Sequence, residues 1–237
     1  NKFLAVGSDD GDNDLLIYRW AGEALTLTTS QHFGTRVSSV ACHPTRNYIA
    51  VGGSYSDTDV ILYGFDGSSL NFIQAEPHGF GAESLQWSSD GNYLAVLGGS
   101  TGSNGLKIYK FTNNSLEEVT ATLGSGGKSV KWSTNNKYLA VGGSFGDPDI
   151  YIYEFSGNSL QEITTLDYGN GVNSVDWDAD SRYLAVGGDY ADNDVTVYLV
   201  NYEHAATSPA VNNSIIFGNS NLGSTYDLDT RLLSGAF

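Results

Sequence analysis

The sequence predicts an all-β protein built from a repeated unit, and three observations lead to this prediction. A motif recurs every 45 residues, beginning at Phe3 ("FLAVGS"), Tyr48 ("YIAVGG"), Tyr93 ("YLAVLGG"), Tyr138 ("YLAVGG") and Tyr183 ("YLAVGG"). Apolar and polar residues alternate with a period of two around each copy, as in half-buried strands. The 29 Gly, 15 Tyr and only 4 Pro suit many short strands joined by tight turns.

Each repeated unit is expected to form four antiparallel strands. In the fourth unit these are "SVKW" at 129–132, "YLAVGG" at 138–143, "IYIYEF" at 150–155 and "QEITTL" at 161–166. The turns between the third and fourth strands share the patterns "FDGSSL", "FTNNSL" and "FSGNSL", whose Gly, Asn and Ser residues favour hairpins. Four-stranded antiparallel units at this period predict a β-propeller with one blade per unit.

The whole chain, 1–237, is therefore predicted to be a single propeller domain with five blades. The repeats start at residues 1, 46, 91, 136 and 181. Radial closure of the blades protects sheet edges that a flat stack would leave exposed.

The unit "VNSVDWDADSRYLAVGGDYADNDVTVYLV" resembles the WD-repeat propellers. The resemblance rests on an inner strand with a terminal aromatic residue, an Asp-containing turn, a small-residue second strand and an acidic turn before "V-x-V-Y". The Trp-Asp dipeptide of the family is absent, replaced by "IYRW", "LYGF", "IYKF" and "IYEF", and the Gly-His pair is missing. The resemblance implies a divergent WD-repeat-like propeller whose polar tetrad is not retained.

The C-terminal residues are expected to close the ring. The chain begins on a second strand, and "TRLLSGAF" at 230–237 aligns with the inner strand "TRVSSVAC" at 35–42. Closure by a terminal strand is also what the resemblance implies. The intervening segment, 201–229, is irregular and is expected to hold the fifth outer strand near "NSIIFG". The alternative is an open or six-bladed fragment.

The charge balance excludes some classes of partner. With 11 Lys+Arg against 27 Asp+Glu, the net charge is −16, so nucleic acid is repelled. Solubility or attraction of basic partners accounts for such acidity. Membrane insertion is not expected, because no apolar run approaches the roughly 18 residues of a spanning helix.

The single cysteine and the chain start bear on localisation. Cys42 excludes an intramolecular disulfide and, at the end of an apolar strand, is expected to be buried. The chain does not start with Met, which indicates processing, and Asn113 and Asn212 fit the glycosylation pattern. An extracellular or secreted location is expected, with the cytoplasm as the alternative.

Asp-x-Asp turns connect the second and third strands of four units, on one face of the predicted ring. The pairs are Asp12 and Asp14, Asp57 and Asp59, Asp147 and Asp149, and Asp192 and Asp194. Ser103 and Gly105 replace them in the third unit. As folding devices, the first Asp would bond to turn amides and the second would start the next strand with a local hydrogen bond. Alternatively, Asp10, Asp12 and Asp14 have the spacing of a Ca²⁺ loop, and no cofactor other than Ca²⁺ is expected.

Aromatic residues on the same face predict a binding surface. Tyr55, Phe145 and Tyr190 lie at the turn tips beside the Asp pairs. The loops that enter the inner strands share this face and add His32, His78, Phe80 and Tyr168. Exposed aromatic rings beside carboxylates suit recognition of a protein segment or of sugar rings.

Other aromatic residues are assigned to the core. Trp87, Trp132 and Trp177 end successive inner strands and are expected to pack between blades. Tyr residues at one position of each third strand are expected to be strand core: Tyr18, Tyr63, Tyr109, Tyr153 and Tyr198.

No catalytic constellation is apparent, because the four histidines are scattered and no nucleophile motif occurs. The predicted function is a non-catalytic binding or assembly scaffold for a protein partner or for self-assembly. The alternatives are a carbohydrate-binding, lectin-like propeller and a glycoside hydrolase on a propeller.

Overall fold

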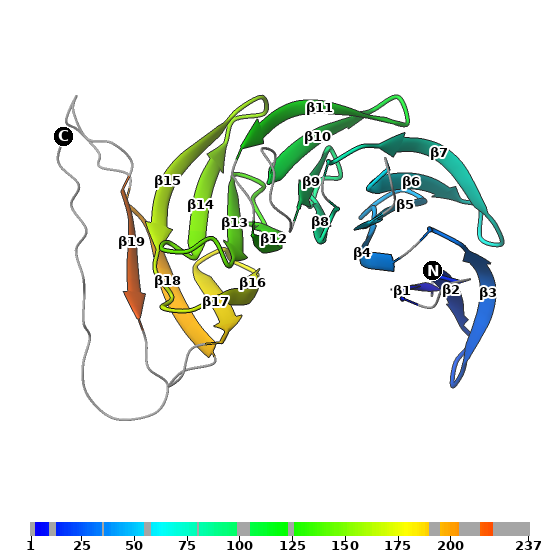
Figure 1. The fold of residues 1–237 in the computed structure, drawn as a ribbon, viewed down its shortest axis with the longest axis horizontal. Helices are drawn as coiled ribbons and strands as arrows, with labels where there is room; N and C mark the ends of the chain where they lie inside the picture. The colour runs from blue at the N-terminus through cyan, green and yellow to red at the C-terminus, as the bar shows by residue number, and fades with distance from the viewer. Residues whose placement is uncertain are drawn as a thin grey trace. The chain divides into compact units, whose positions relative to one another are not determined.

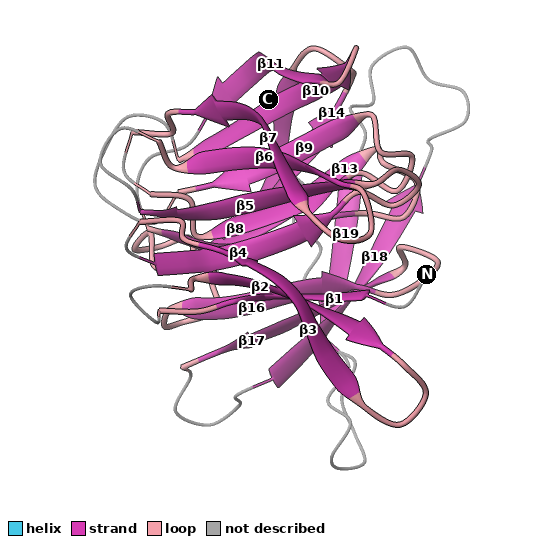
Figure 2. Ribbon diagram, turned by 90° about the vertical axis from the view of Figure 1, so that its right-hand side faces the viewer, coloured by secondary structure: helices cyan, strands magenta, loops and turns pink. Residues whose placement is uncertain are grey.

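The computed structural model contains strands as its regular elements in the part of the chain that it describes (Figure 2). The described residues are 3–9, 13–34, 36–54, 58–79, 81–98, 105–122, 126–189, 195–200 and, by backbone alone, 201–203 and 214–219. Within these ranges, no helix has the length and hydrophobicity needed to cross a membrane. The chain divides into two compact units, Asn1–Val130 and Lys131–Phe237.

The first unit contains three antiparallel sheets in which neighbours in sequence are neighbours in space (Figure 1). The first sheet has three described strands, β1 (Phe3–Gly7), β2 (Leu15–Trp20) and β3 (Leu25–Gln31). The second sheet has four, β4 (Arg36–Cys42), β5 (Tyr48–Ser54), β6 (Val60–Phe65) and β7 (Leu70–Glu76). The third has β8 (Ser84–Trp87), β9 (Tyr93–Leu97), β10 (Leu106–Thr112) and β11 (Ser115–Thr122).

Two further four-stranded sheets follow the same order. The fourth sheet has β12 (Gly127–Trp132), which crosses the boundary between the units, β13 (Tyr138–Gly143), β14 (Ile150–Phe155) and β15 (Leu160–Leu166). The fifth has β16 (Val172–Trp177), β17 (Tyr183–Gly188), β18 (Val195–Glu203) and β19 (Ser214–Asn219). The prediction of repeated four-stranded antiparallel units is confirmed, and β19 covers most of the expected outer strand "NSIIFG".

The first sheet has three strands among the described residues, in the order β1, β2, β3. The predicted closing strand, 230–237, lies outside the described residues.

A β-bulge recurs at one place in the first four sheets, between the third and fourth strands. The register shifts directly before Tyr18, Tyr63, Tyr109 and Tyr153. Tyr63, Tyr109 and Tyr153 are buried, which confirms them as strand core, whereas Tyr18 is half-buried. A bulge increases local twist and re-aims a side chain, so the repeated tyrosine and the repeated bulge form one structural device.

Glycines at the end of the second strand allow neighbouring sheets to approach. A Cβ atom at Gly52 would collide with Leu85 on β8, and one at Gly142 would collide with Val172 on β16. The Ala-Val-Gly-Gly part of the sequence motif therefore reflects packing of one sheet against the next inner strand.

Tryptophans at the end of the inner strands join adjacent sheets within each unit. Trp87 Nε1–H donates to the carbonyl of Ala41 at 3.0 Å, and Trp177 Nε1–H donates to that of Lys131 at 3.2 Å. Both side chains are buried, so packing between sheets is confirmed for them. The predicted burial of Cys42 is wrong: it occupies the corresponding strand end but its side chain is exposed.

Candidate functional site

Each sheet has two ends that carry different connections. One carries the turn between the second and third strands and the loop that follows the fourth strand; we call it the Asp-turn end. In the second sheet it comprises residues 58–59 and 77–79 among those described. The other, the hairpin end, carries the first-to-second and third-to-fourth turns, which are residues 43–47 and 66–69 in that sheet. The predicted binding residues belong to the Asp-turn end.

The second aspartate of each described Asp-x-Asp turn clamps the two connections of this end together. The Asp14 carboxylate accepts hydrogen bonds from the backbone N–H groups of Phe33 (2.9 Å) and Gly34 (3.2 Å). The Asp59 carboxylate accepts from His78 (2.9 Å) and Gly79 (2.8 Å).

Asp149 repeats this clamp in the second unit. Its carboxylate accepts from the backbone N–H groups of Tyr168 and Gly169, both at 3.2 Å. The expected local hydrogen bond of the second Asp is therefore wrong, since the partners lie 19 and 20 residues away. The backbone hydrogen bonds between the third and fourth strands stop where the fourth strand ends. A carboxylate at the start of the third strand can still reach the N–H groups of the loop that follows.

The three clamping carboxylates are buried, with 0 to 6% of each residue exposed. Two amide donors compensate part of the cost of removing a carboxylate from water. At Asp149, burial raises the pKa; hydrogen bonds from Tyr168 and Gly169 lower it, and the charges of Asp167 and Asp147 raise it further.

The third sheet keeps the backbone link without the carboxylate. Gly98 N–H donates to the Gly105 carbonyl at 2.6 Å, just as Gly53 N–H donates to Asp59 at 3.0 Å. In the fifth sheet, Asp192 and Asp194 lie outside the described residues.

Aromatic rings after the fourth strand pack between neighbouring sheets. Phe33, His78 and Tyr168 occupy one position in three loops, and all are buried. Each ring lies against a glycine at or just beyond the end of the second strand of the following sheet. These glycines are Gly53, Gly98 and Gly188. Two of the predicted binding residues, His78 and Tyr168, are therefore buried rather than exposed.

Three predicted site residues remain accessible among those described. Phe145 is half-buried, with its ring edge-to-face against Tyr151 at 5.2 Å. Asp147, two residues further on, is exposed. The His32 side chain is 52% exposed, and its Nδ1 lies 3.0 Å from the Asp14 carboxylate. The other predicted residues lie outside the described part of the chain: Asp10, Asp12, Tyr55, Asp57, Phe80, Tyr190, Asp192 and Asp194.

A group of carboxylates that could hold a cation occurs in the fourth sheet. Oxygen atoms of Asp147, Asp149 and Asp167 all lie within 4.8 Å of one another, and carboxylate oxygens suit Ca²⁺. Asp14 of the sequence-predicted metal site instead binds Phe33, Gly34 and His32. The sequence did not predict Asp167 as part of a cation site, because it lies 18 residues after Asp149. Only the folded sheet brings the turn of Asp149 and the loop of Asp167 together.

Comparisons with known proteins identify the repeat. The WD40 model, "WD domain, G-beta repeat", matches residues 24–63 and 160–198, each stretch running from a fourth strand to the next third strand. No curated protein sequence matches the chain significantly.

Solved structures share the fold at low sequence identity. A chain of the mitotic checkpoint complex is 20% identical, with a TM-score of 0.67, over 92% of this chain and 70% of that chain. Sqt1 from Chaetomium thermophilum is 21% identical, with a TM-score of 0.65, over 83% and 53%. A putative 6-phosphogluconolactonase from Bacteroides uniformis is 15% identical, with a TM-score of 0.65, over 79% and 61%.

The chain therefore spans less than two thirds of the lactonase-like chain and about half of Sqt1. WD40 proteins commonly bind other proteins and are mostly non-catalytic, although lactonase-like structures share the propeller fold. The matched stretches identify the repeating unit as a divergent WD40 repeat, and the repeated four-stranded sheets have the fold of β-propeller blades.

Proposed function

We propose that the chain is a non-catalytic scaffold that binds a protein partner, or a second copy of itself, through the face that carries the Asp-x-Asp turns. The observation that supports this most is the repeated clamp of Asp14, Asp59 and Asp149. Each clamp fixes two loops of one sheet end to each other. Loops held on a rigid scaffold bind with a smaller loss of conformational entropy.

The contact chemistry of this face is acidic and aromatic. Asp147 offers an exposed carboxylate, and Phe145 offers part of an aromatic ring beside it. A basic segment with an aliphatic or aromatic residue complements this pair, because cations are attracted both to carboxylates and to ring faces.

A peptide array tests this proposal. We expect the full chain to prefer Lys- and Arg-containing peptides over their Glu- and Asp-containing counterparts. The double variant Phe145→Ala, Asp147→Ala should weaken binding of the selected peptides by about tenfold or more.

Phe72→Ala provides the matched control, because Phe72 is 63% exposed on β7, an outer strand. Equal binding by the wild type and the double variant would contradict the proposed face. Selective binding to a glycan array, lost in the same double variant, would instead indicate a carbohydrate-binding propeller.

We also propose that residues 230–237 complete the first sheet. The alignment of "TRLLSGAF" with "TRVSSVAC" supports this, as does β2 being the single described strand paired with β1. Truncation after residue 229 should lower the melting temperature, whereas an unchanged value would favour an open or six-bladed arrangement.

Secretion is a further proposal, supported by the two glycosylation patterns. Asn113 lies exposed in the turn between β10 and β11. Expression through a secretory pathway should give a glycosidase-sensitive mass shift that Asn113→Gln reduces. Absence of any shift would remove this support.

A further inference from the structure

A cavity of about 670 Å³ lies at the hairpin end of the first unit, between the β4–β5 turn and the β10–β11 hairpin. Arg46 lines it from the second sheet, and Asn92, Tyr93, Lys110, Asn113 and Asn114 line it from the third. It lies at the opposite end of the sheets from the Asp-x-Asp turns, and its lining contains none of the predicted binding residues that the structure describes.

The β4–β5 turn departs from the repeat. At the position of Arg46, the later sheets have Gly91, Asn136 and Ser181, all with positive φ (73°, 59° and 56°), whereas Arg46 is not in this conformation. His43 holds the turn instead. Its Nδ1 accepts from the N–H groups of Thr45 (3.2 Å) and Arg46 (3.0 Å). Because Nδ1 is an acceptor, Nε2 carries the proton and donates to the Gly91 carbonyl at 3.0 Å.

The β10–β11 hairpin also departs from the repeat. It closes through a two-residue turn, Asn113 and Asn114, with φ of 51° and 63°, whereas the other described hairpins at this place have longer turns. The Tyr48 hydroxyl donates to Asn114 Oδ1 at 2.6 Å and so ties this hairpin to the second sheet. Two departures in neighbouring repeats therefore border one cavity.

Aromatic packing fixes the position of the arginine. The Arg46 guanidinium lies 5.5 Å from the centroid of the Phe111 ring. Phe111 is itself buried and packs edge-to-face on Tyr48 at 5.0 Å and on Trp87 at 5.3 Å. An arginine held in this way loses little side-chain entropy when it binds an anion.

Two cationic side chains line the cavity. Across the described ranges, neither Arg46 nor Lys110 has a carboxylate within ion-pair distance, whereas Arg36, Lys107, Lys131 and Lys137 are paired. The nearby Asp90 is hydrogen-bonded to Ser88 and to both nitrogens of Asn92, and Asp66 to Ser68 and Ser69. Glu117 is the cross-strand neighbour of Lys110 on β11. Two cationic side chains at one cavity stand out in a chain of net charge −16.

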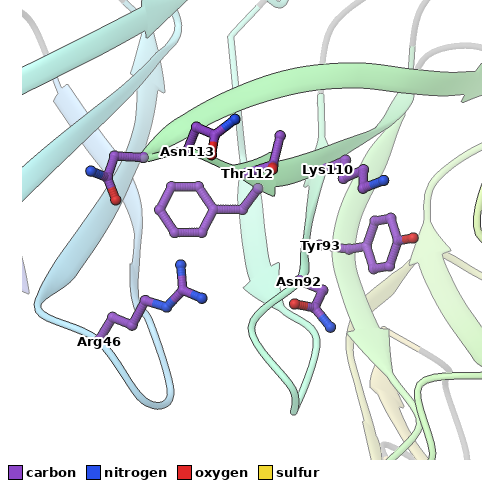
Figure 3. A pocket seen from close by; sticks show the side chains of 8 residues that line it. Arg46, Asn92, Tyr93, Lys110, Thr112 and Asn113 are labelled. Carbon is purple, nitrogen blue, oxygen red and sulfur yellow. The ribbon is translucent and has the colours of Figure 1, made fainter.

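Arg46 and Lys110 lie on opposite sides of the lining (Figure 3). Arg46 projects from the β4–β5 turn on one side, and Lys110 lies on the other side above Tyr93 with its amine turned away from Arg46; Asn92 and Asn113 lie between them. A ligand that satisfies this lining has two anionic groups joined by a hydrogen-bonding chain. Arginine binds carboxylates in a bidentate manner, and side-chain amides pair with peptide N–H and C=O groups.

We propose that this cavity binds an acidic peptide segment, with one carboxylate at Arg46 and a second at Lys110. The site is separate from the face proposed above, so the chain would hold two partners, or two parts of one partner, at opposite ends of its sheets. Failure at one site leaves the other proposal unaffected.

Calorimetric titration of the full chain with a capped hexapeptide containing two glutamates tests the site at physiological salt. We expect saturable binding, and no binding of the same peptide with glutamines. Arg46→Gln and Lys110→Gln should each weaken binding about fivefold. Arg19→Gln is the matched control, because Arg19 occupies the position of Lys110 on β2 of the first sheet and does not line the cavity.

Three results would overturn the proposal. These are absence of binding by the wild type, equal binding of the glutamine peptide, and an equal effect of Arg19→Gln. Full displacement of the glutamate peptide by millimolar phosphate at constant ionic strength would show a site for free oxyanions and would also reject the peptide. The glutamine peptide keeps the test decisive even where a variant folds poorly, because it probes the unaltered protein.

Discussion

Asp59 shows how a buried side chain can hold a surface loop in place. Its carboxylate is desolvated and accepts from two backbone N–H groups at 2.8 and 2.9 Å. Without that acceptor, the amides of His78 and Gly79 would lose their partner at a place that water reaches poorly. An unsatisfied buried amide costs about 1–3 kcal/mol.

Asp59→Ala is therefore expected to lower the free energy of unfolding by about 2 kcal/mol. Asp59→Asn retains an acceptor oxygen and should lose less. Urea denaturation followed by fluorescence measures both. The control is Asp147→Ala, which alters an exposed Asp-x-Asp residue and should stay within about 0.5 kcal/mol of the wild type. Equal losses for Asp59→Ala and Asp147→Ala would show that the clamp contributes nothing specific.

His78 gives the protein a predicted sensitivity to acid. Burial lowers its pKa from 6.5 to about 4, helped by the charge of Lys107 and opposed by those of Asp59 and Glu118. Both ring nitrogens are buried and have no hydrogen-bond partner among the described residues. Between pH 6.5 and 4, the unfolded chain binds a proton that the folded chain does not. This part of the stability is therefore present above pH 6.5 and is lost as the pH falls towards 4.

The loss between pH 7 and 4.5 should be about 2 kcal/mol. His78→Phe copies Phe33 at the corresponding position. It should remove the pH dependence of stability that comes from His78 and leave the part that comes from the carboxylates. Comparing unfolding free energies of the two proteins at both pH values isolates the histidine. An identical pH dependence in the variant would contradict the assignment.

At the scale of strands and sheets, small residues decide how closely neighbours pack. The second strand of one sheet faces the first strand of the next, and Gly52 meets Leu85 and Ala82 there. Gly64 lies on the adjacent strand, β6, where an added Cβ would make ordinary contact with Ile73 at 3.5 Å. Two glycines of one sheet thus have opposite packing requirements.

Gly52→Ala should destabilise the protein by about 1–3 kcal/mol, because the new methyl group overpacks the contact between β5 and β8. Gly64→Ala should be neutral or slightly stabilising, since alanine reduces the conformational entropy of the unfolded chain. The melting temperatures of the two variants measure the difference in stability. Destabilisation of equal size in both variants would argue against close packing at Gly52.

At the scale of the whole molecule, charge opposes compactness. The net charge is −16, and four of the eleven Lys and Arg residues form ion pairs with carboxylates in the described part of the chain. Self-repulsion of like charges favours expanded states, and salt screens it.

Raising the sodium chloride concentration from 0.01 to 0.15 M should therefore stabilise the fold, by on the order of 1 kcal/mol. The Debye length falls from about 30 to about 8 Å over this range. Melting temperatures at the two concentrations measure the effect, with sucrose as an uncharged control. A lower melting temperature in salt would show that ion pairs outweigh the net repulsion.

The strands were predictable because their signal is local. Period-two alternation, turn residues and the 45-residue spacing are each contained within one unit, so they predicted β12 to β15 closely. The packing of Trp87 and Trp177 was also predictable, since a large aromatic residue repeated at one strand end is most readily buried between neighbouring sheets.

The site was less predictable because its contacts join distant segments. An Asp-x-Asp pair gives no sign that its second member will bind amides 19 and 20 residues away. His78 and Tyr168 looked like exposed loop residues, since loops usually lie at the surface, yet the next sheet covers them. No sequence motif marked Arg46, because its surroundings are made by Phe111 and the hairpin of another repeat.

The sequence by itself determined the all-β class, the repeated unit and the likeness of that unit to the WD40 repeat, because these follow from periodicity and local turn chemistry. Tertiary structure alone decided which aspartates are buried, which aromatic rings are covered and which cationic side chains line one cavity. Burial and charge compensation depend on the distances between residues of different sheets, and no spacing along the chain encodes those distances.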